Sequence, residues 1–446
     1  MNFSGQTELG GLSATANRRG SVLVIVLWMT FGLVSITLYF ANAMNFELRT
    51  ADNRVAGLAA EQAIAGAARY VSYVVTQLAT NGTVPNASIL QPDANIGDAH
   101  FWLIGRDTNN PVGAGQLYFG LVDEGAKLNL NTTTSNTLAA LISLLPNANL
   151  DLAAGIVDWR DTNGGAYQTY YAMQTKPYLS KSAPFETIDE LRLVYGADPL
   201  SLVGEDVNRN GVLDASEQDE NRNGMLDPGV LEYVTVYSRE PNTRTNGSPR
   251  VRLNNIPALR SLLQEKLGNS RAQQILPPNQ VQGFPSPLAF YLATNMKAEE
   301  FDAMANDITS TNGAFIEGRV NINTASETVL ASLPGMSLEA AGQLIQYRQS
   351  HPDSLGSIAW IKEALSSNRD ALNELQRRDY ITAKSYQFTA DIAALGPYGR
   401  GYRRVRMVFD TSEGTPRIIY RQDLSQLGWA LGKDVRQAWL SAKATR

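Results

Sequence analysis

One apolar run near the N-terminus constrains this chain more than any other feature. Two arginines and a glycine, Arg18, Arg19 and Gly20, directly precede 24 mostly apolar residues, 21–44, that carry no charge. A run of this length spans a lipid bilayer as an α-helix. The helical pattern then continues without a proline or a turn cluster. The sequence therefore predicts one long helix, 21–80, whose first part crosses a membrane and whose second part packs on a soluble domain.

The polar segment before this run, 1–20, has the character of a leader peptide. A secretory signal is cleaved after its apolar core at small residues, but here the small residue, Gly20, precedes the core. Cleavage between Gly20 and Ser21 would leave the apolar helix on the mature chain. The two arginines predict a cytoplasmic leader and an external head. The alternative is an ordinary signal anchor with an uncut N-terminus.

Composition excludes several classes of site. The 446 residues are 43% hydrophobic and 18% charged, which indicates a globular protein with two or three domains. The formal net charge of −5 does not favour nucleic acid as the main partner. The absence of cysteine excludes disulfides, thiol catalysis and Cys-bound metals. With only two histidines, His100 and His351, and no catalytic constellation, we expect a protein that is not an enzyme.

Strand-like runs flank a large helical block. Period-2 alternation with β-branched and aromatic residues predicts strands at 100–107 and 116–124 and an antiparallel meander over 386–423. We expect an α+β fold in which the long helix packs on a small antiparallel sheet, and a mainly helical domain is inserted into the sheet domain. The predicted boundaries are 1–20 for the leader, 21–80 for the long helix, 81–126 and 381–423 for the sheet domain, 127–380 for the inserted domain and 424–446 for the tail.

Two segments of the inserted domain resemble each other. The segments that begin at Lys127 and Arg319 both read basic–aliphatic–Asn–aliphatic–Asn–Thr, followed by a helix, a proline turn and a second helix that ends near an arginine. The pairs Asn131–Thr132 and Asn323–Thr324 are expected to cap the first helix of each unit. The pattern predicts an internal repeat of helix-hairpin-helix units.

Helix-hairpin-helix units that bind DNA use a glycine-rich hairpin whose backbone N–H groups approach a phosphate. The two predicted turns, 145–149 and 333–337, lack the full set of glycines, and no cluster of lysines or arginines flanks them. Structural packing is therefore favoured over DNA binding.

A loop dense in Asp and Asn carries the strongest chemical motif. Residues 206–217 match the twelve-residue calcium loop at positions one, three, five, six, nine and twelve, and 219–227 repeat its first nine positions thirteen residues later. The predicted ligands of the first ion are Asp206, Asn208, Asn210, the carbonyl of Val212, Asp214 and Glu217. Those of the second are Asp219, Asn221, Asn223, the carbonyl of Met225 and Asp227.

The second loop lacks an acidic residue at position twelve, where Val230 stands, and Glu232 is the predicted substitute. The doubled period resembles the tandem calcium loops of thrombospondin type 3 repeats and dockerins. We expect two calcium ions in a calcium-stabilised loop, 206–232, without paired flanking helices. The alternative is a polar loop of Asx turns without metal.

These motifs together resemble the general secretion pathway protein K family, the minor pseudopilins of type II secretion systems. The resemblance covers most of the chain in order. It rests on the basic-Gly leader before SVLVIVLWM and on the segments ELRTADNR, DEGAKLNLNT, IVDWRD, PFETIDELRLVYG and GRVNINTASETVLASLPG.

The resemblance implies a structural subunit at the tip of the pseudopilus, in a machine that exports folded proteins across the outer membrane. It implies leader removal after Gly20 by a prepilin peptidase, methylation of Ser21, a pseudopilin core, and an inner-membrane helix with a periplasmic head. Its partners would be other minor pseudopilins, the prepilin peptidase and inner-membrane lipid, with no nucleic acid. The alternatives are a membrane-anchored DNA-binding or uptake protein, or the tip subunit of a related type IV pilus.

One residue and one loop bear on this resemblance. Most pilin-like subunits have Glu as the fifth mature residue, whereas Ile25 stands here, as in this family, whose members are placed at the tip. A carboxylate without an amine partner would be costly in lipid. Members of the family bind calcium in the inserted domain, but the tandem loop at 201–230 departs from the family pattern.

The second part of the long helix is expected to pack an apolar stripe on the C-terminal meander and leave its other faces for partner subunits. The predicted stripe consists of Val55, Leu58, Ala59, Ile64, Val71 and Val75.

Overall fold

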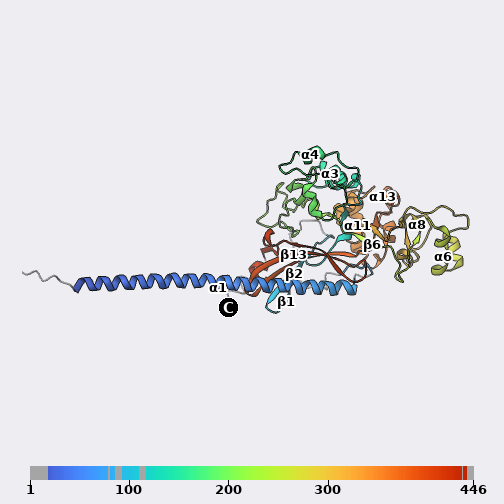
Figure 1. Ribbon diagram of the computed structural model, residues 1–446. Coiled ribbons are helices and arrows are strands. Elements are labelled where there is room, and N and C mark those ends of the chain that lie inside the picture. The colour runs from blue at the N-terminus through green and yellow to red at the C-terminus, as the bar shows by residue number, and fades with distance from the viewer. Residues whose placement is uncertain (1–18, 79–80, 86–92, 110–116, 434, 439–446) are drawn as a thin grey trace, which may run out of the picture. The chain divides into compact units, whose positions relative to one another are not determined.

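The computed structural model describes residues 19–78, 81–85, 93–109, 117–433 and 435–438 (Figure 1). The chain divides into two units, Met1–Ala56 and Gly57–Arg446, and each is described by itself. The leader prediction, 1–20, and the end of the tail fall largely outside the described residues.

The first unit consists of the N-terminal part of helix α1 (Arg19–Leu78). Its apolar side chains from Val22 to Met44 are mostly exposed. In the described part of the chain, α1 is the one helix that is long and apolar enough to cross a membrane. The helix predicted from the sequence over 21–80 is confirmed as far as Leu78.

The second unit contains a six-stranded antiparallel sheet in the strand order β1-β2-β12-β13-β14, with β3 paired to β12. Its longest strands, β12 and β13, come from the predicted C-terminal meander, which is confirmed. The sheet therefore joins strands from before and after the helical region of the chain. The strands are β1 (Ala94–Ile96), β2 (Ala99–Ile104), β3 (Val122–Asp123), β12 (Gln387–Gly396), β13 (Arg400–Asp410) and β14 (Arg417–Asp423).

One face of the sheet packs against the C-terminal part of α1 through small side chains. Ala60, Ala63 and Ala67 are fully buried in a cluster with strand residues such as Phe388 and Ile392. The alanines let the helix backbone lie close to the sheet. The predicted stripe is correct for four of its members: Ile64, Val71 and Val75 are buried, and Ala59 is partly buried against the same cluster. It is wrong for Val55 and Leu58, whose side chains are exposed.

Along each strand, successive side chains point to opposite faces of the sheet, so every second residue faces away from α1. Trp102, Ala393 and Leu395 point to this side and pack with Ala430 and Leu431 of the C-terminal segment. On the same strands, buried charged side chains face the Asp/Asn-rich loop. The sheet is therefore covered on both faces.

Between β3 and β12, the chain forms a mainly helical region around one large apolar core. The helices are α2 (Ser135–Ser143), α3 (Asp151–Arg160), α4 (Gln168–Ala172), α5 (Pro199–Val203), α6 (Ile256–Leu267), α7 (Asn269–Ile275), α8 (Pro287–Ala293), α9 (Ala298–Asp302), α10 (Glu327–Ser332), α11 (Leu338–Ser350), α12 (Ile361–Ala364) and α13 (Arg369–Leu375). Short strand pairs are β4 (Leu128–Asn129) with β5 (Val234–Thr235), β6 (Arg239–Pro241) with β9 (Phe315–Glu317), β7 (Val251–Arg252) with β8 (Ile308–Thr309), and β10 (Val320–Asn321) with β11 (Ile381–Thr382).

The internal repeat is visible in equivalent contacts. At the end of α3, Arg160 donates to the carbonyls of Leu130 and Thr133. Near the end of α11, Arg348 donates to the carbonyls of Ile322 and Ala325 at 3.0 and 2.8 Å. Each arginine thus ties the second helix of its unit to the chain before the first helix.

The predicted caps are wrong by a few residues. Thr134 and Ser326 are the N-cap residues of α2 and α10, because their hydroxyls accept from the backbone N–H three residues on. The predicted capping residues Asn131 and Asn323 instead donate from their side chains to the carbonyls of Phe185 and Leu355.

Candidate metal centre

The Asp/Asn-rich segment is a loop whose ends lie side by side. Gly204 and Pro228 form an isolated antiparallel bridge, and the N–H of Glu205 donates to the carbonyl of Asp227 at 2.9 Å. The loop begins after α5 and ends before a short turn of 3₁₀ helix, Val230–Glu232. The two predicted calcium loops therefore lie within one closed segment.

In the first loop, the side chain of Asp206 organises the backbone. Its Oδ1 accepts from the N–H of Asn210 and its Oδ2 accepts from the N–H of Gly211, both at 2.9 Å. Gly211 has φ of 84°, which suits glycine at the sharp turn of a calcium loop. The carboxylate of Glu217 accepts from the N–H of Asn208 at 3.1 Å and of Asp214 at 3.0 Å.

Asp214 completes this cluster. Its Oδ2 accepts from the side-chain amides of Asn208 and Asn210 at 2.6 and 2.8 Å. The Oδ1 atoms of Asn208 and Asn210 accept from the backbone N–H of Asn210 and Val212 at 3.0 and 2.9 Å. The side chains of Asn208, Asn210 and Asp214 therefore converge on one small volume.

The second loop repeats this arrangement. The N–H of Asn223 and of Gly224 donate to the two oxygens of Asp219 at 3.2 and 2.8 Å. Asp227 Oδ2 accepts from the side-chain amides of Asn221 and Asn223 at 2.5 and 3.3 Å. The two loops differ in exposure. Asp206, Asn208 and Asn210 of the first loop are buried, whereas most of the second loop is exposed.

Glu232, the predicted substitute at the end of the second loop, is bound by Arg106. Its carboxylate accepts from Nε and Nη2 of Arg106 at 2.6 and 3.2 Å. Glu232 is partly buried, which opposes ionisation, but Arg106 holds the pKa of its carboxyl below the ordinary value. The carboxylate of Glu232 is therefore bound by Arg106, next to the first loop. It forms no hydrogen bond with the second loop.

Sequence reasoning missed Glu205, which stands before the first motif. Its Oε1 accepts from the N–H of Glu220 at 2.8 Å and its Oε2 accepts from the N–H of Asp227 at 3.0 Å. The signal that could have found it is the acidic residue directly next to Asp206, in a segment whose two ends must meet.

The first loop is fastened to the sheet by arginines. Arg106 donates to the carbonyls of Asn210 and Arg209 at 3.2 and 3.0 Å. Arg404 of β13 donates to the carbonyl of Asn208 and, at 2.8 Å, to that of Arg209. The loop therefore lies on the face of the sheet opposite α1.

This contact depends on a buried carboxylate in β12. Asp391 accepts from Nε and Nη2 of Arg404, both at 2.7 Å, and from Arg406 at 2.8 Å. Asp391 is buried, which opposes ionisation, but these two arginines lower its pKa to about 2. The carboxylate fixes both guanidinium groups, and Arg404 then orients the loop carbonyls.

The first loop concentrates negative charge. Burial raises the pKa of Asp206, although Arg106 partly opposes this effect. Burial also raises the pKa of Glu217, and the charges of Asp206 and Asp214 add to the shift. A bound cation would stabilise these carboxylates in their charged form.

The donor set fits a hard cation. In the described residues, no group of three or more His, Asp or Glu side chains can hold a metal by itself. A metal site in this segment therefore needs Asn and backbone oxygens as well as carboxylates. Such all-oxygen sets suit Ca²⁺, which accepts six to eight oxygen ligands in flexible geometry.

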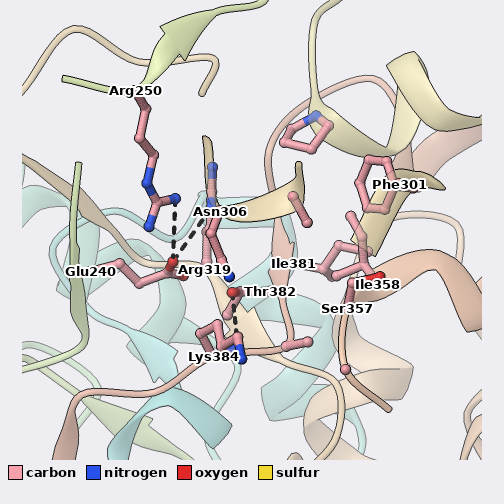
Figure 2. A pocket seen from close by; sticks show the side chains of 14 residues that line it. Glu240, Arg250, Phe301, Asn306, Arg319, Ser357, Ile358, Ile381, Thr382 and Lys384 are labelled. Atoms are coloured by element: carbon pink, nitrogen blue, oxygen red, sulfur yellow. Dashed lines mark hydrogen bonds and ion pairs between the residues drawn. The ribbon is translucent and has the colours of Figure 1, made fainter. Parts of the chain in front are cut away.

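A separate polar cavity lies in the helical region. Figure 2 shows Glu240 between Arg250 and Arg319, and Oε2 of Glu240 is 3.5 Å from Nη1 of Arg319. The cavity has a volume of about 40 Å³. Oε1 of Glu240 and Nε of Arg319 are buried and have no hydrogen-bond partner among the described groups. Its size and polarity suit ordered water.

The apolar helix and the antiparallel sheet on which its second part packs define a pilin-like subunit. Two family models, both described as type II secretion system (T2SS), protein K, match residues 121–202 and 320–376. Two separate segments of the chain therefore match this one family. Neither match includes the tandem loops, which lie between the two matched segments.

No curated protein matches the sequence. Among solved structures, a chain of the GspK-GspI-GspJ complex from the type 2 secretion system of enterotoxigenic Escherichia coli is similar, with 11% identity and a TM-score of 0.39. The match covers 82% of this chain and 95% of that chain.

Proposed function

We propose that this protein is a structural minor pseudopilin at the tip of a type II secretion pseudopilus. The observation that carries this proposal is the combination of the apolar part of α1, the antiparallel sheet on the second part of α1, and the two protein K family matches. Its role is mechanical: it forms part of the fibre that drives export of folded proteins. It catalyses no reaction in this role.

The membrane part follows from the sequence before and within α1. The arginines Arg18 and Arg19 hold the leader in the cytoplasm, and α1 crosses the inner membrane with the rest of the chain in the periplasm. A prepilin peptidase cleaves after Gly20, and the new N-terminal Ser21 is methylated. Ile25 has no carboxylate to pair with another subunit's amine, which suits a position with nothing above it.

The partners are other minor pseudopilins. In the second unit, the faces of α1 that do not contact the sheet carry exposed side chains such as Leu58 and Tyr73. These side chains, together with the apolar membrane segment, suit packing against the equivalent helices of other subunits. In the E. coli structure named above, GspK forms a complex with GspI and GspJ.

Calcium is the expected cofactor. Asp206, Asn208, Asn210, Asp214 and Glu217 would hold one ion with the carbonyl of Val212, and Asp219, Asn221, Asn223 and Asp227 a second with the carbonyl of Met225. Binding would supply the positive charge that the clustered carboxylates lack and would order a segment with few apolar contacts.

Co-purification tests the assembly proposal. The full chain, co-expressed with each of the other minor pseudopilins of the same secretion system and extracted in detergent, should form a stable complex with at least one. Leu58→Glu should weaken this complex, whereas Ile418→Glu, an exposed site on β14, serves as a control. A full chain that stays alone with every partner would contradict the proposal.

Mass spectrometry of the membrane fraction tests processing. The wild-type chain should begin at a methylated Ser21, and Gly20→Leu should retain the leader, because the peptidase needs a very small residue at the cut. An intact N-terminus in the wild-type protein would contradict the pseudopilin assignment and leave an uncut signal anchor.

A further inference from the structure

We propose that Glu205 supplies the carboxylate that completes the second calcium site, in place of an acidic residue at position twelve of that loop. This inference rests on the calcium proposal above. It assigns to the second site a ligand that lies before the first loop in sequence, so that the two sites interlock.

The equivalence of Glu205 and Glu217 is seen in their backbone partners. Glu217 accepts from the N–H of Asp214, position nine of the first loop, at 3.0 Å. Glu205 accepts from the N–H of Asp227, position nine of the second loop, also at 3.0 Å. The other oxygen of each carboxylate accepts from an N–H near the start of its loop, Asn208 for the first and Glu220 for the second.

The burial of Glu205 is a second observation that suits a cation bound beside its carboxylate. Glu205 is only 2% exposed. Among the residues that the structure describes, none forms an ion pair with it. A buried carboxylate is normally paired with a cation or coordinates a metal. The neighbouring Asp206 differs, because Arg106 lies 3.9 Å from its carboxylate.

The two residues that the loop motif itself would offer are unsuitable. Val230 stands at position twelve and is fully buried in the apolar core. Glu232 is held by Arg106 through two hydrogen bonds. Glu205 is therefore the carboxylate that remains to bind the second ion with both of its oxygens, opposite Asp227.

This placement links the two sites through one peptide bond. Glu205 would bind the second ion and the next residue, Asp206, would bind the first. Occupation of one site fixes the backbone that presents a ligand to the other. We therefore expect the two ions to bind with positive cooperativity.

Calorimetric titration of the detergent-solubilised full chain with calcium chloride tests the inference. The wild-type chain should bind two ions. Glu205→Gln should bind the second at least about tenfold more weakly, since a charged bidentate ligand is lost. Asp219→Asn should give the same loss, and Glu232→Gln should retain two ions, although it also loses a charge.

Tryptic cleavage after Arg222 provides a second readout. Arg222 is exposed in the second loop, and calcium should protect it in the wild-type chain and in Glu232→Gln but not in Glu205→Gln. Circular dichroism checks that each variant is folded. If Glu205→Gln fails to fold, Asp219→Asn and the more conservative Glu205→Asp are compared, and both should lose the second ion.

The outcomes separate the two proposals. A wild-type chain that binds no calcium overturns the calcium proposal and this inference together. A wild-type chain with two ions whose Glu205→Gln variant keeps both affinities overturns the role of Glu205 alone. A single ion in the wild-type chain, lost in Glu217→Gln and unchanged in Glu205→Gln, also overturns it and leaves the first site in place.

Discussion

The carboxylate of Asp391 lies between two arginines of the neighbouring strand, and this cluster joins the sheet to the first Asp/Asn-rich loop. Arg404 is completely buried, so its charge is tolerated only because Asp391 neutralises it. The same guanidinium binds the carbonyls of Asn208 and Arg209. At the scale of single residues, the contact between sheet and loop is therefore electrostatic and has little tolerance for the loss of one partner.

Substitution Asp391→Asn should destabilise the protein by about 3–5 kcal/mol at neutral pH, because it leaves a buried arginine unpaired. The pKa of Asp391 is lowered to about 2 from 3.8, so the stabilisation by its charge is fully present above the unfolded value and is lost as the pH falls toward 2. In urea unfolding, the difference between variant and wild type should shrink between pH 5 and pH 2. A pH-independent difference would contradict this account.

The turn glycines of the two loops provide a matched pair of substitutions. Gly211 and Gly224 have φ of 84° and 74°, a region that costs other residues about 1–2 kcal/mol. A Cβ at Gly211 would also lie 2.9 Å from the side chain of Arg106, whereas a Cβ at Gly224 would meet nothing within 4 Å. Thermal unfolding should therefore show a larger loss for Gly211→Ala than for Gly224→Ala; equal losses would mean that Arg106 moves aside freely.

At the scale of elements, local pattern predicts much of the fold. The helix α1 and the strands β12, β13 and β14 follow from runs of apolar residues and from period-2 alternation, which need no knowledge of distant residues. The two Asp/Asn-rich loops follow from a contiguous motif, and their internal hydrogen bonds repeat at the expected spacing. Each of these features is encoded within a short stretch of chain.

The features that could not be predicted depend on contacts between distant residues. The partner of Asp227 is Glu205, twenty-two positions earlier, and that of Glu232 is Arg106, 126 positions earlier. Loop motifs read in chain order pointed to Glu232 because it follows the second loop. The burial of α1 was also misjudged, since the sheet contacts its alanines and leaves the larger Leu58 exposed.

The alanine face of α1 leads to a prediction about this element. Ala67 is fully buried against the sheet, so Ala67→Leu should overpack the contact and cost about 1–3 kcal/mol. Tyr73→Ala, on an exposed position of the same helix, should leave the stability of the folded protein nearly unchanged. Thermal unfolding of the full chain in detergent compares them. Similar melting temperatures for wild type and Ala67→Leu would mean that the helix can move away from the sheet.

At the scale of the second unit, the first Asp/Asn-rich loop, 206–217, lies where three parts of the chain meet. Its carbonyls bind Arg106 and Arg404, and the side-chain amides of Asn208 and Asn210 donate to the carbonyls of Trp429 and Ala430 at 3.4 and 3.1 Å. The loop itself extends from the helical region. A cation that orders this loop would therefore also order the contact between the helical region, the sheet and the C-terminal segment.

Removal of calcium should consequently loosen this junction as well as the loop. If the ion binds only the folded protein, chelation should remove about 2.7 kcal/mol of stability when free calcium had been a hundred times its dissociation constant. Hydrogen exchange should increase at 206–211 and at 429–431, because these segments hold each other. Trypsin should then cut after the exposed Arg222 before the buried Arg209, whose carbonyl accepts from three arginines.

Magnesium is the control for this experiment, since it prefers a tighter octahedral site and should restore the protection poorly. The variant Glu217→Gln should already exchange rapidly at 429–431 in the presence of calcium, since the first ion would be bound weakly. If chelation changes the exchange of the loop but leaves 429–431 unaffected, the junction is held by Arg404 and Asp391 alone, and calcium orders only the loop.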